Sequence, residues 1–198
     1  MFQQTYPSIN HRSKSTLVLA LVFVTGVLAL TGFIGTPSAS ASAPAPNPST
    51  AKYEINYMEM LSDHHFGGIK VDQQCVAKAI HEALKDNCQT DIKDQQKQID
   101  EMHSWLKKWY GIEYQPKVMP DVEAILQYLT PLHGKAFEVA VMENLIPHHL
   151  QAINMSKVAE VRAYHHDLKD LAKEVVTGQT KSIHELTDYL CNFYGICN

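Results

Sequence analysis

Strong basic character is absent from this sequence of 198 residues. Lysine and arginine number 17 against 21 acidic residues, and no basic run is longer than two. A nucleic-acid binder presents a basic face to the phosphates, so this class is excluded. Charged residues make up only 19% and hydrophobic residues 45%, which also excludes an intrinsically disordered chain. The length predicts one domain, or two at most.

The sequence also lacks the common catalytic motifs. No glutamate is followed three residues later by histidine, which excludes the paired Glu-x-x-His motifs of di-iron bundles. His81-Glu82 and His184-Glu185 begin a zinc-protease motif, but Lys85 and Asp188 occupy the position of its second histidine. We therefore expect a binding protein and not an enzyme.

The first 43 residues have the composition of a secretory signal peptide. Arg12 and Lys14 precede an uncharged apolar run from Thr16 to Ile34, and small residues follow it up to Ala43. We expect cleavage in that stretch, export to the periplasm, and a flexible leader over residues 44–51. The apolar run is close to the length that spans a bilayer, so a membrane-associated or released form stays open.

A repeat at an offset of 84 residues organises the rest of the chain. Residues 54–112 and 138–196 align without a gap and share 20 identities in 59 positions. Each copy has two stretches with a 3.6-residue hydrophobic period, which predicts two helical hairpins, over 52–112 and 134–198. Two such hairpins can bury their apolar faces against each other. The predicted fold is an all-α, ferritin-like four-helix bundle.

The connections follow from the same alignment. Turns are expected near 76–80 and 160–164, where His81, His165 and His166 would be solvated, with helix capping or weak surface metal binding as the alternatives. A linker over 113–133 joins the copies and holds a short helix over 121–129. Thr130 and Pro131 have the residue types of an N-cap and first helical position, so they are expected to begin the next helix.

Four cysteines in an exported chain indicate disulfides. Cys75 and Cys88 lie almost symmetrically about the first turn, and Cys191 and Cys197 are separated by a helix end and a glycine. These positions predict the pairs Cys75–Cys88 and Cys191–Cys197. Free buried cysteines and thiolate metal ligands are the alternatives, although no C-x-x-C spacing supports a metal site.

Histidine and methionine are the residue types that point to a ligand. The chain has 11 His and 7 Met, and imidazole and thioether groups bind borderline and soft metals. A spacing of seven residues places Met58 with His65, and Met142 with His149, on one side of a helix. Folding each hairpin adds residues from its second helix, which predicts one metal cluster per copy. The first comprises Met58, Met60, His64, His65, Met102 and His103, and the second comprises Met142, His148, His149, Met155 and His184.

The expected metal is copper. A Met/His set without thiolates favours Cu(I), tolerates Cu(II) through its imidazoles, and keeps its ligands in an oxidising compartment. Methionine also fills hydrophobic cores. A structural helical bundle without tight metal binding is therefore an alternative.

A family resemblance rests on the same residues. The stretch His133–His149, followed by Ala152-Ile153-Asn154-Met155, resembles the signature of a bacterial ferritin-like family of tandem His-His/Met metal-binding proteins. Gln95, Ile99, Met102, Trp105 and Leu106 resemble the second half of that signature. The resemblance implies these copper ligands: Met58, His64, His65 and Met102, then Met142, His148, His149 and Met155. Asp63, Val71 and Leu186 depart from the family pattern, which has a proline and two methionines there.

The resemblance also implies a function outside the cytoplasm. The expected role is copper sequestration or shuttling for copper resistance, with copper ions as cargo and an efflux system or its periplasmic sensor as partner. The alternatives are an exported binder of zinc, nickel or silver, the structural bundle, and, as the weaker enzymatic reading, a copper oxidase.

Overall fold

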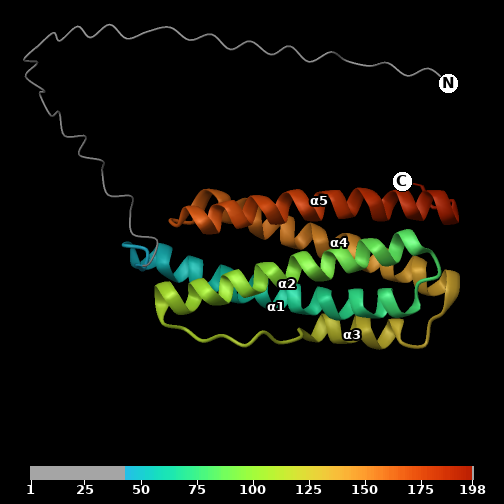
Figure 1. The fold of residues 1–198 in the computed structure, drawn as a ribbon, viewed down its shortest axis with the longest axis horizontal. Coiled ribbons are helices and arrows are strands. Elements are labelled where there is room, and N and C mark those ends of the chain that lie inside the picture. Colours follow the sequence, from blue (N-terminus) through green and yellow to red (C-terminus); the bar gives the residue numbers. More distant parts are fainter. Residues whose placement is uncertain (1–42, 198) are drawn as a thin grey trace, which may run out of the picture. The chain divides into compact units, whose positions relative to one another are not determined.

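The computed structural model describes residues 43–197, which form five α-helices and no strand. They are α1 (Pro48–Lys78), α2 (Glu82–Tyr110), α3 (Pro120–Leu129), α4 (Gly134–Arg162) and α5 (His166–Tyr194) (Figure 1). The all-α prediction is confirmed. Except for Ala43, the predicted signal peptide lies outside the described residues. None of the described helices has the length and apolar character needed to cross a membrane.

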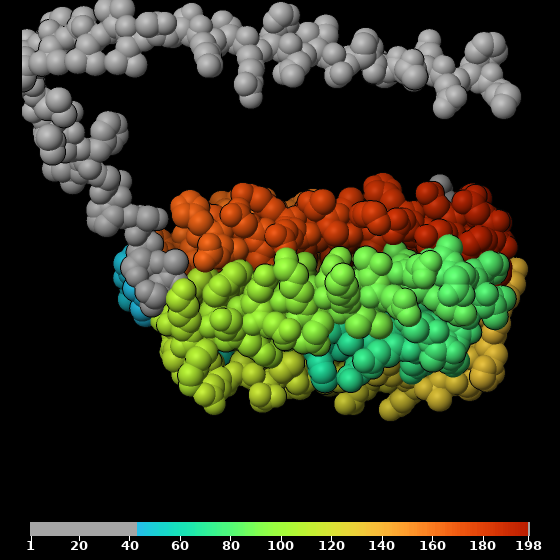
Figure 2. Space-filling model, viewed as in Figure 1, coloured from blue at the N-terminus to red at the C-terminus, as the bar shows by residue number. Residues whose placement is uncertain are grey.

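The four long helices form two hairpins. Residues 79–81 connect α1 to α2, and residues 163–165 connect α4 to α5, close to the expected turns. The hairpins meet where α1 packs on α4 and α2 packs on α5, while α3 packs on α1 and α4. Figure 2 shows the face on which α2 and α5 lie side by side.

Local sequence explains where the helices begin and end. The Asn47 side chain accepts a hydrogen bond from the Ser49 backbone at 2.9 Å, and Pro48 occupies the first turn of α1. The expected leader over 44–51 is therefore too long, because its last four residues are helical. Gly111 and Gly195 end α2 and α5 with φ of 69°, a left-handed conformation that glycine adopts without strain.

One expected helix start is wrong. Thr130 caps the C-terminus of α3, where its hydroxyl donates to the Leu126 carbonyl at 2.7 Å, and α4 begins at Gly134. Threonine bonds equally well to the carbonyl four residues before it, so its type alone does not distinguish a helix start from a helix end.

Both expected disulfides are present. Cys75–Cys88 joins α1 to α2 across the first turn, and Cys191–Cys197 closes the C-terminal end of α5. All four cysteines are oxidised, which leaves no thiol in the described chain for a metal.

A buried glutamate in each hairpin caps the second helix of the other hairpin. Glu54 of α1 accepts from the backbone N–H groups of Tyr164 and His165 at 2.6 and 2.9 Å, from His165 Nδ1 at 2.7 Å, and from the Tyr110 hydroxyl at 2.5 Å. The negative charge lies where the first backbone N–H groups of α5 are free, a favourable position for an anion. We call this set of contacts the Glu54 cap.

The repeat reproduces this cap at the opposite end. Glu138 of α4 accepts from the backbone N–H groups of Ile80 and His81 at 2.6 and 2.8 Å, from His81 Nδ1 at 2.6 Å, and from the Tyr194 hydroxyl. Burial by itself raises the pKa of Glu138, but the bonds from Tyr194, His81 and Ile80 outweigh it and lower the pKa. We call this set the Glu138 cap.

The caps overturn the expectation that His81 and His165 are solvated. His165 is only 6% exposed and stacks on Trp109 with 3.8 Å between ring centroids. His81 stacks on Phe193 at 4.0 Å, and only His166 is exposed as expected. Their position beside a turn says nothing about the facing hairpin, which contacts both side chains and buries His165.

The core has two apolar clusters at different levels along the helices. One surrounds Phe137, Met142 and Leu84, and the other surrounds Met58, Leu106 and Leu168. Between these levels the helices bury polar side chains, which are His65, Asp72, Asp91, Gln95, Gln98, His148, His149 and Ser182. The middle of the molecule is therefore polar and histidine-rich, which the hydrophobic pattern did not indicate.

Candidate metal centre

The two hairpins share one histidine pair at their interface. His64 of α1 stacks on His148 of α4 with 3.7 Å between ring centroids and 23° between the ring planes. These residues correspond in the repeat, so the contact joins equivalent positions of the two copies. The neighbouring rings of His65 and His149 lie about 6 Å away on either side. The expectation of a separate cluster in each hairpin is therefore wrong for His64 and His148, which meet each other.

Burial favours the neutral form of three of these imidazoles, His64, His65 and His148. Burial lowers the pKa of His64 to about 4, and the nearby His149 adds to the effect. Burial and then the charge of His64 lower the pKa of His65 to about 3. Burial, followed by repulsion from His64, holds the pKa of His148 well below its usual value. Neutral imidazole is the form that binds metals, so no proton has to leave first.

Their ring nitrogens are available as ligands. Neither ring nitrogen of His64, His65 or His148 has a hydrogen bond of normal geometry with the described residues. Buried polar atoms without a partner are rare, because each one costs roughly 1–3 kcal/mol. A metal ion would satisfy these lone pairs, so the donor set fits a metal.

A cleft of about 420 Å³ opens onto the stacked pair. Three methionines line it, and its other walls include His64 and His148. Met60 comes from α1, Met155 from α4, and Met119 from the segment just before α3. Met60 is 60% exposed and Met119 is 40% exposed, so their sulfur atoms are within reach of an entering ion. We call this the Met/His cleft.

The linker is held in place by Asp63, the residue that stands where the family has proline. Asp63 Oδ1 accepts from the Lys117 backbone at 2.9 Å, which fixes the segment that ends in Met119. A proline here would have no such acceptor. The departure from the family pattern thus coincides with a third methionine at the cleft.

Two glycines allow this close packing on α1. A Cβ at Gly68 would lie 2.5 Å from Gln95 Oε1 and 2.8 Å from His148 Cε1, distances at which neighbours must move. A Cβ at Gly67 would lie 3.1 Å from the Val122 side chain of α3. The Gly67-Gly68 pair therefore admits the second histidine and α3 to the face of α1.

The remaining predicted ligands lie elsewhere. Met58 and Met102 are fully buried in one apolar cluster, and Met142 is fully buried in the other. His103 is half-buried beside Tyr114, with ring centroids 6.1 Å apart, and His184 is exposed. A role for these five residues as ligands stays a prediction.

Sequence reasoning missed Met119 altogether and gave Met60 no weight beyond the first cluster. Met119 lies outside both copies, so the repeat carried no signal for it. No three His, Cys, Asp or Glu side chains of the described chain surround one point as a metal requires. The thioethers of the cleft are what would complete a coordination shell.

Comparisons with known proteins agree with this fold. The sequence pattern of a family described as "Domain of unknown function (DUF305)" matches residues 54–190. Among curated proteins, none has a matching sequence.

Three solved structures are similar at low identity. The first, "CopM in the Cu(I)-bound form", has a TM-score of 0.63 and 24% identity over 72% of this chain and 98% of that one. The second, "CopM in the Cu(II)-bound form", gives 0.65 and 22%, over 71% and 97%. The third, a DUF305 fragment from Deinococcus radiodurans, gives 0.63 and 17%, over 75% and 97%. The chain thus resembles CopM, and identities this low establish the fold alone.

Proposed function

We propose that this chain, which belongs to the DUF305 family, is an exported copper-binding protein that sequesters or shuttles copper for copper resistance, in support of efflux. The Met/His cleft is the observation that carries the proposal. It places three thioethers beside two neutral imidazoles whose ring nitrogens have no hydrogen bond of normal geometry with the described residues. Thioether and imidazole together favour a soft ion such as Cu(I).

The resemblance to CopM supports the choice of metal. CopM structures hold Cu(I), Cu(II) or Ag. Ag(I) is a soft ion like Cu(I), so it is a convenient probe for the cleft of this chain and also the main competing cargo. Zinc and nickel would use the imidazoles, but these ions bind neutral thioethers weakly and would leave the three methionines without a role.

The proposal includes the location of the protein, its bundle architecture and the partner that receives copper. Residues 1–43 would direct export to the periplasm, and the two hairpins would form a ferritin-like four-helix bundle. The protein would lower free copper without catalysing a reaction. Its cargo would pass to an efflux system or its periplasmic sensor.

The decisive experiment separates the exposed methionines from the buried ones. Residues 42–198 are titrated anaerobically with Cu(I) against a chromophoric chelator. Replacing Met60, Met119 and Met155 by leucine removes the thioethers of the cleft but keeps their volume. We expect Cu(I) affinity to fall at least about 10-fold, while helicity stays unchanged.

A matched variant carries leucine at Met58, Met102 and Met142, the buried thioethers implied by the family resemblance. We expect this variant to keep its Cu(I) affinity, although its stability changes. Loss of affinity in the matched variant alone would show that the buried methionines are the ligands. Failure of the wild-type protein to compete for Cu(I) would favour a structural bundle, and steady turnover of Cu(I) with oxygen would favour an oxidase.

A further inference from the structure

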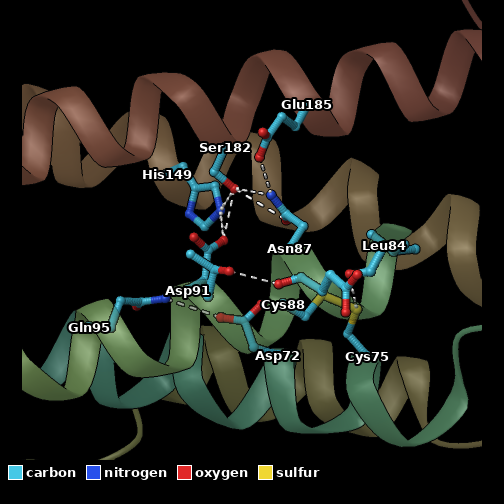
Figure 3. Close-up of polar contacts among 12 residues, drawn as sticks. Asp72, Cys75, Leu84, Asn87, Cys88, Asp91, Gln95, His149, Ser182 and Glu185 are labelled. Atoms are coloured by element: carbon cyan, nitrogen blue, oxygen red, sulfur yellow. Dashed lines mark hydrogen bonds and ion pairs between the residues drawn. A yellow bond between two sulfur atoms is a disulfide. The ribbon is translucent and has the colours of Figure 1, made fainter. Parts of the chain in front are cut away.

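The neighbouring histidines His64, His65, His148 and His149 form what we call the histidine layer. A second polar site lies between α2, α4 and α5, on the side of this layer away from the Met/His cleft. Asp91 of α2, His149 of α4 and Ser182 of α5 point toward one another (Figure 3). Asp91 Oδ2 lies 3.1 Å from His149 Nε2 and 2.8 Å from Ser182 Oγ, and the hydroxyl lies 3.2 Å from the same ring nitrogen. The three atoms form a nearly equilateral triangle.

This triangle is not a hydrolytic triad. In a triad the carboxylate bonds one ring nitrogen and the serine bonds the other. Here both oxygens face Nε2, and Nδ1 of His149 has no partner among the described residues. The carboxylate therefore does not orient the ring as a base for the serine.

The spacing matches three ligands that share one metal ion. Nitrogen and oxygen ligands lie about 2.0–2.2 Å from a divalent ion such as zinc, so two ligands at right angles are about 3 Å apart. The three edges of the triangle are 2.8, 3.1 and 3.2 Å. One face of an octahedral or tetragonal site has these dimensions.

Two buried carboxyl groups lie here, and the one ion pair that either forms within the described chain is that of Asp91 with His149. Asp72 of α1 is fully buried; its Oδ2 accepts from Gln95 Nε2 at 3.1 Å, and its Oδ1 has no partner among residues 43–197 (Figure 3). No lysine or arginine in the described chain forms an ion pair with either carboxylate. Buried carboxylates normally have such a partner or a bound metal.

Solvent reaches this site through a notch at Gly178. A cleft of about 130 Å³ is lined by Asp91, Gln98 and Gly178, among others. Gly178 takes the place that Asp94 has in the first copy, and a Cβ there would meet nothing within 4 Å. Gln98 is only 7% exposed, and its Oε1 has no hydrogen bond of normal geometry with the described residues. Because Gln98 lines the same cleft as Asp91, its carbonyl oxygen is a further candidate ligand.

We propose that Asp91, His149 and Ser182, with Gln98 at the notch, form a second cation site for a borderline divalent ion such as Cu(II). It differs from the Met/His cleft in offering oxygen and nitrogen ligands and no sulfur. The site does not depend on the proposed function, because it shares no residue with the cleft. The two sites select opposite classes of ion.

The test uses Cu(II) as the probe and electron paramagnetic resonance as the readout. Residues 42–198 are first saturated with Ag(I), which fills the soft cleft and gives no signal, and Cu(II) is then added. We expect one bound Cu(II) with oxygen ligands and a single nitrogen ligand. Asp91→Asn keeps the shape of the side chain but should weaken Cu(II) binding at least about 10-fold. Asp94→Asn, an exposed carboxylate at the rim of the same cleft, is the matched control and should change the affinity little.

Gly178→Leu provides a second test that leaves every ligand in place. Leucine favours a helix more than glycine does, so the variant should fold, while its side chain fills the notch. We expect Cu(II) to bind several times more slowly or not at all. Equal Cu(II) affinity and rate in the wild type, Asp91→Asn and Gly178→Leu would overturn the site. So would a Cu(II) signal that His64→Gln/His148→Gln abolishes, because that would place the ion in the cleft. Loss of Ag(I) binding alone would count against the proposed function and not against this site.

Discussion

Glu54 in the first hairpin and Glu138 in the second make the same four contacts, three with the opposite hairpin and one with a tyrosine of their own, yet the two ends of the molecule are not equal. At the Glu54 cap, His165 Nε2 also bonds the Ala43 carbonyl at 2.8 Å, and the leader covers the site. At the Glu138 cap, the side chain of His81 remains 36% exposed. The two copies of the repeat therefore keep the same cap contacts between the hairpins, while the exposure of the residues around each cap has diverged.

The copies diverge further in the middle of the molecule. Asp72 and Asp91 of the first hairpin correspond to Ser156 and Val175 of the second. Ser156 bonds the Tyr57 hydroxyl at 2.8 Å, and Val175 packs in an apolar cluster. The first copy therefore supplies all the buried carboxylates of the histidine layer, and the oxygen-rich site exists on one side only.

The largest effect is expected from removing a cap. Glu54→Ala leaves two backbone N–H groups, His165 and Tyr110 without an acceptor, and we expect the free energy of unfolding to fall by about 4 kcal/mol. For Glu138→Ala we expect about 3 kcal/mol, because its partners are more exposed to water. Urea denaturation monitored by circular dichroism measures both. Glu143→Ala, at an exposed position of α4, should change stability by less than about 0.5 kcal/mol. Equal losses in all three variants would contradict a role for the caps.

The disulfide that closes the longer loop should contribute more to the stability of the fold. Cys75–Cys88 spans 13 residues and Cys191–Cys197 spans 6. Loop entropy predicts that replacing the first pair by alanine costs about 3 kcal/mol and replacing the second about 2 kcal/mol. Urea denaturation of the two double variants, compared with the wild type under oxidising conditions, tests the difference. A larger loss for the second pair would show that the C-terminal end of α5 matters more than the first turn.

Acid should destabilise the histidine layer. Burial first, and then the nearby His149, lower the pKa of His64 from 6.5 to about 4, so at pH 5 the unfolded state binds a proton that the folded state does not. Protonation of His64 does not change the free energy of unfolding above pH 6.5. As the pH falls from 6.5 to about 4, it lowers this free energy progressively. We expect a loss of about 2 kcal/mol at pH 5 from this residue.

Denaturation of the apo protein at pH 7 and pH 5 tests this, with His64→Gln and His148→Gln as variants. Because the two rings stack on each other, each substitution should reduce the pH dependence to a similar degree. A pH dependence that neither variant changes would mean that other groups cause it.

The smallest loss of stability is expected at a glycine of the first copy whose counterpart in the second copy is alanine. Gly68 of the first copy corresponds to Ala152 of the second. Gly68→Ala would push on Gln95 and His148, and we expect a cost of about 1–2 kcal/mol with weaker Cu(I) binding. Gly67→Ala meets only the end of the Val122 side chain and should cost less. Thermal unfolding and the Cu(I) titration measure both variants. A neutral Gly68→Ala would show that His148 does not need this close approach.

Local signals in the sequence predicted much of the fold. The 3.6-residue period located four long helices, the turns fell within a few residues, and the positions of the cysteines about the turns predicted both disulfides. The short helix after Pro120 was also expected and is α3. Each of these features depends on residues close in sequence or on one hairpin folding on itself.

The metal centre was less accessible to sequence reasoning because it depends on how the hairpins meet. Met58 and Met142 have the spacing of ligands, but that spacing also faces the apolar core, where both are buried. The repeat showed that His64 and His148 are equivalent, and equivalence alone does not show contact. The caps were missed for the same reason, since Glu54 and His165 are 111 residues apart.

The crossed caps also bear on the origin of the chain. A single hairpin with the features common to both copies would carry the capping glutamate on one face and an uncapped helix start at its turn. Two identical molecules would satisfy each other in an isologous dimer, with the stacked histidines on its two-fold axis. Duplication and fusion of such a gene would preserve that interface. Each half would then be free to change alone, which a symmetric homodimer cannot do, and a soft-metal side could become distinct from a carboxylate side.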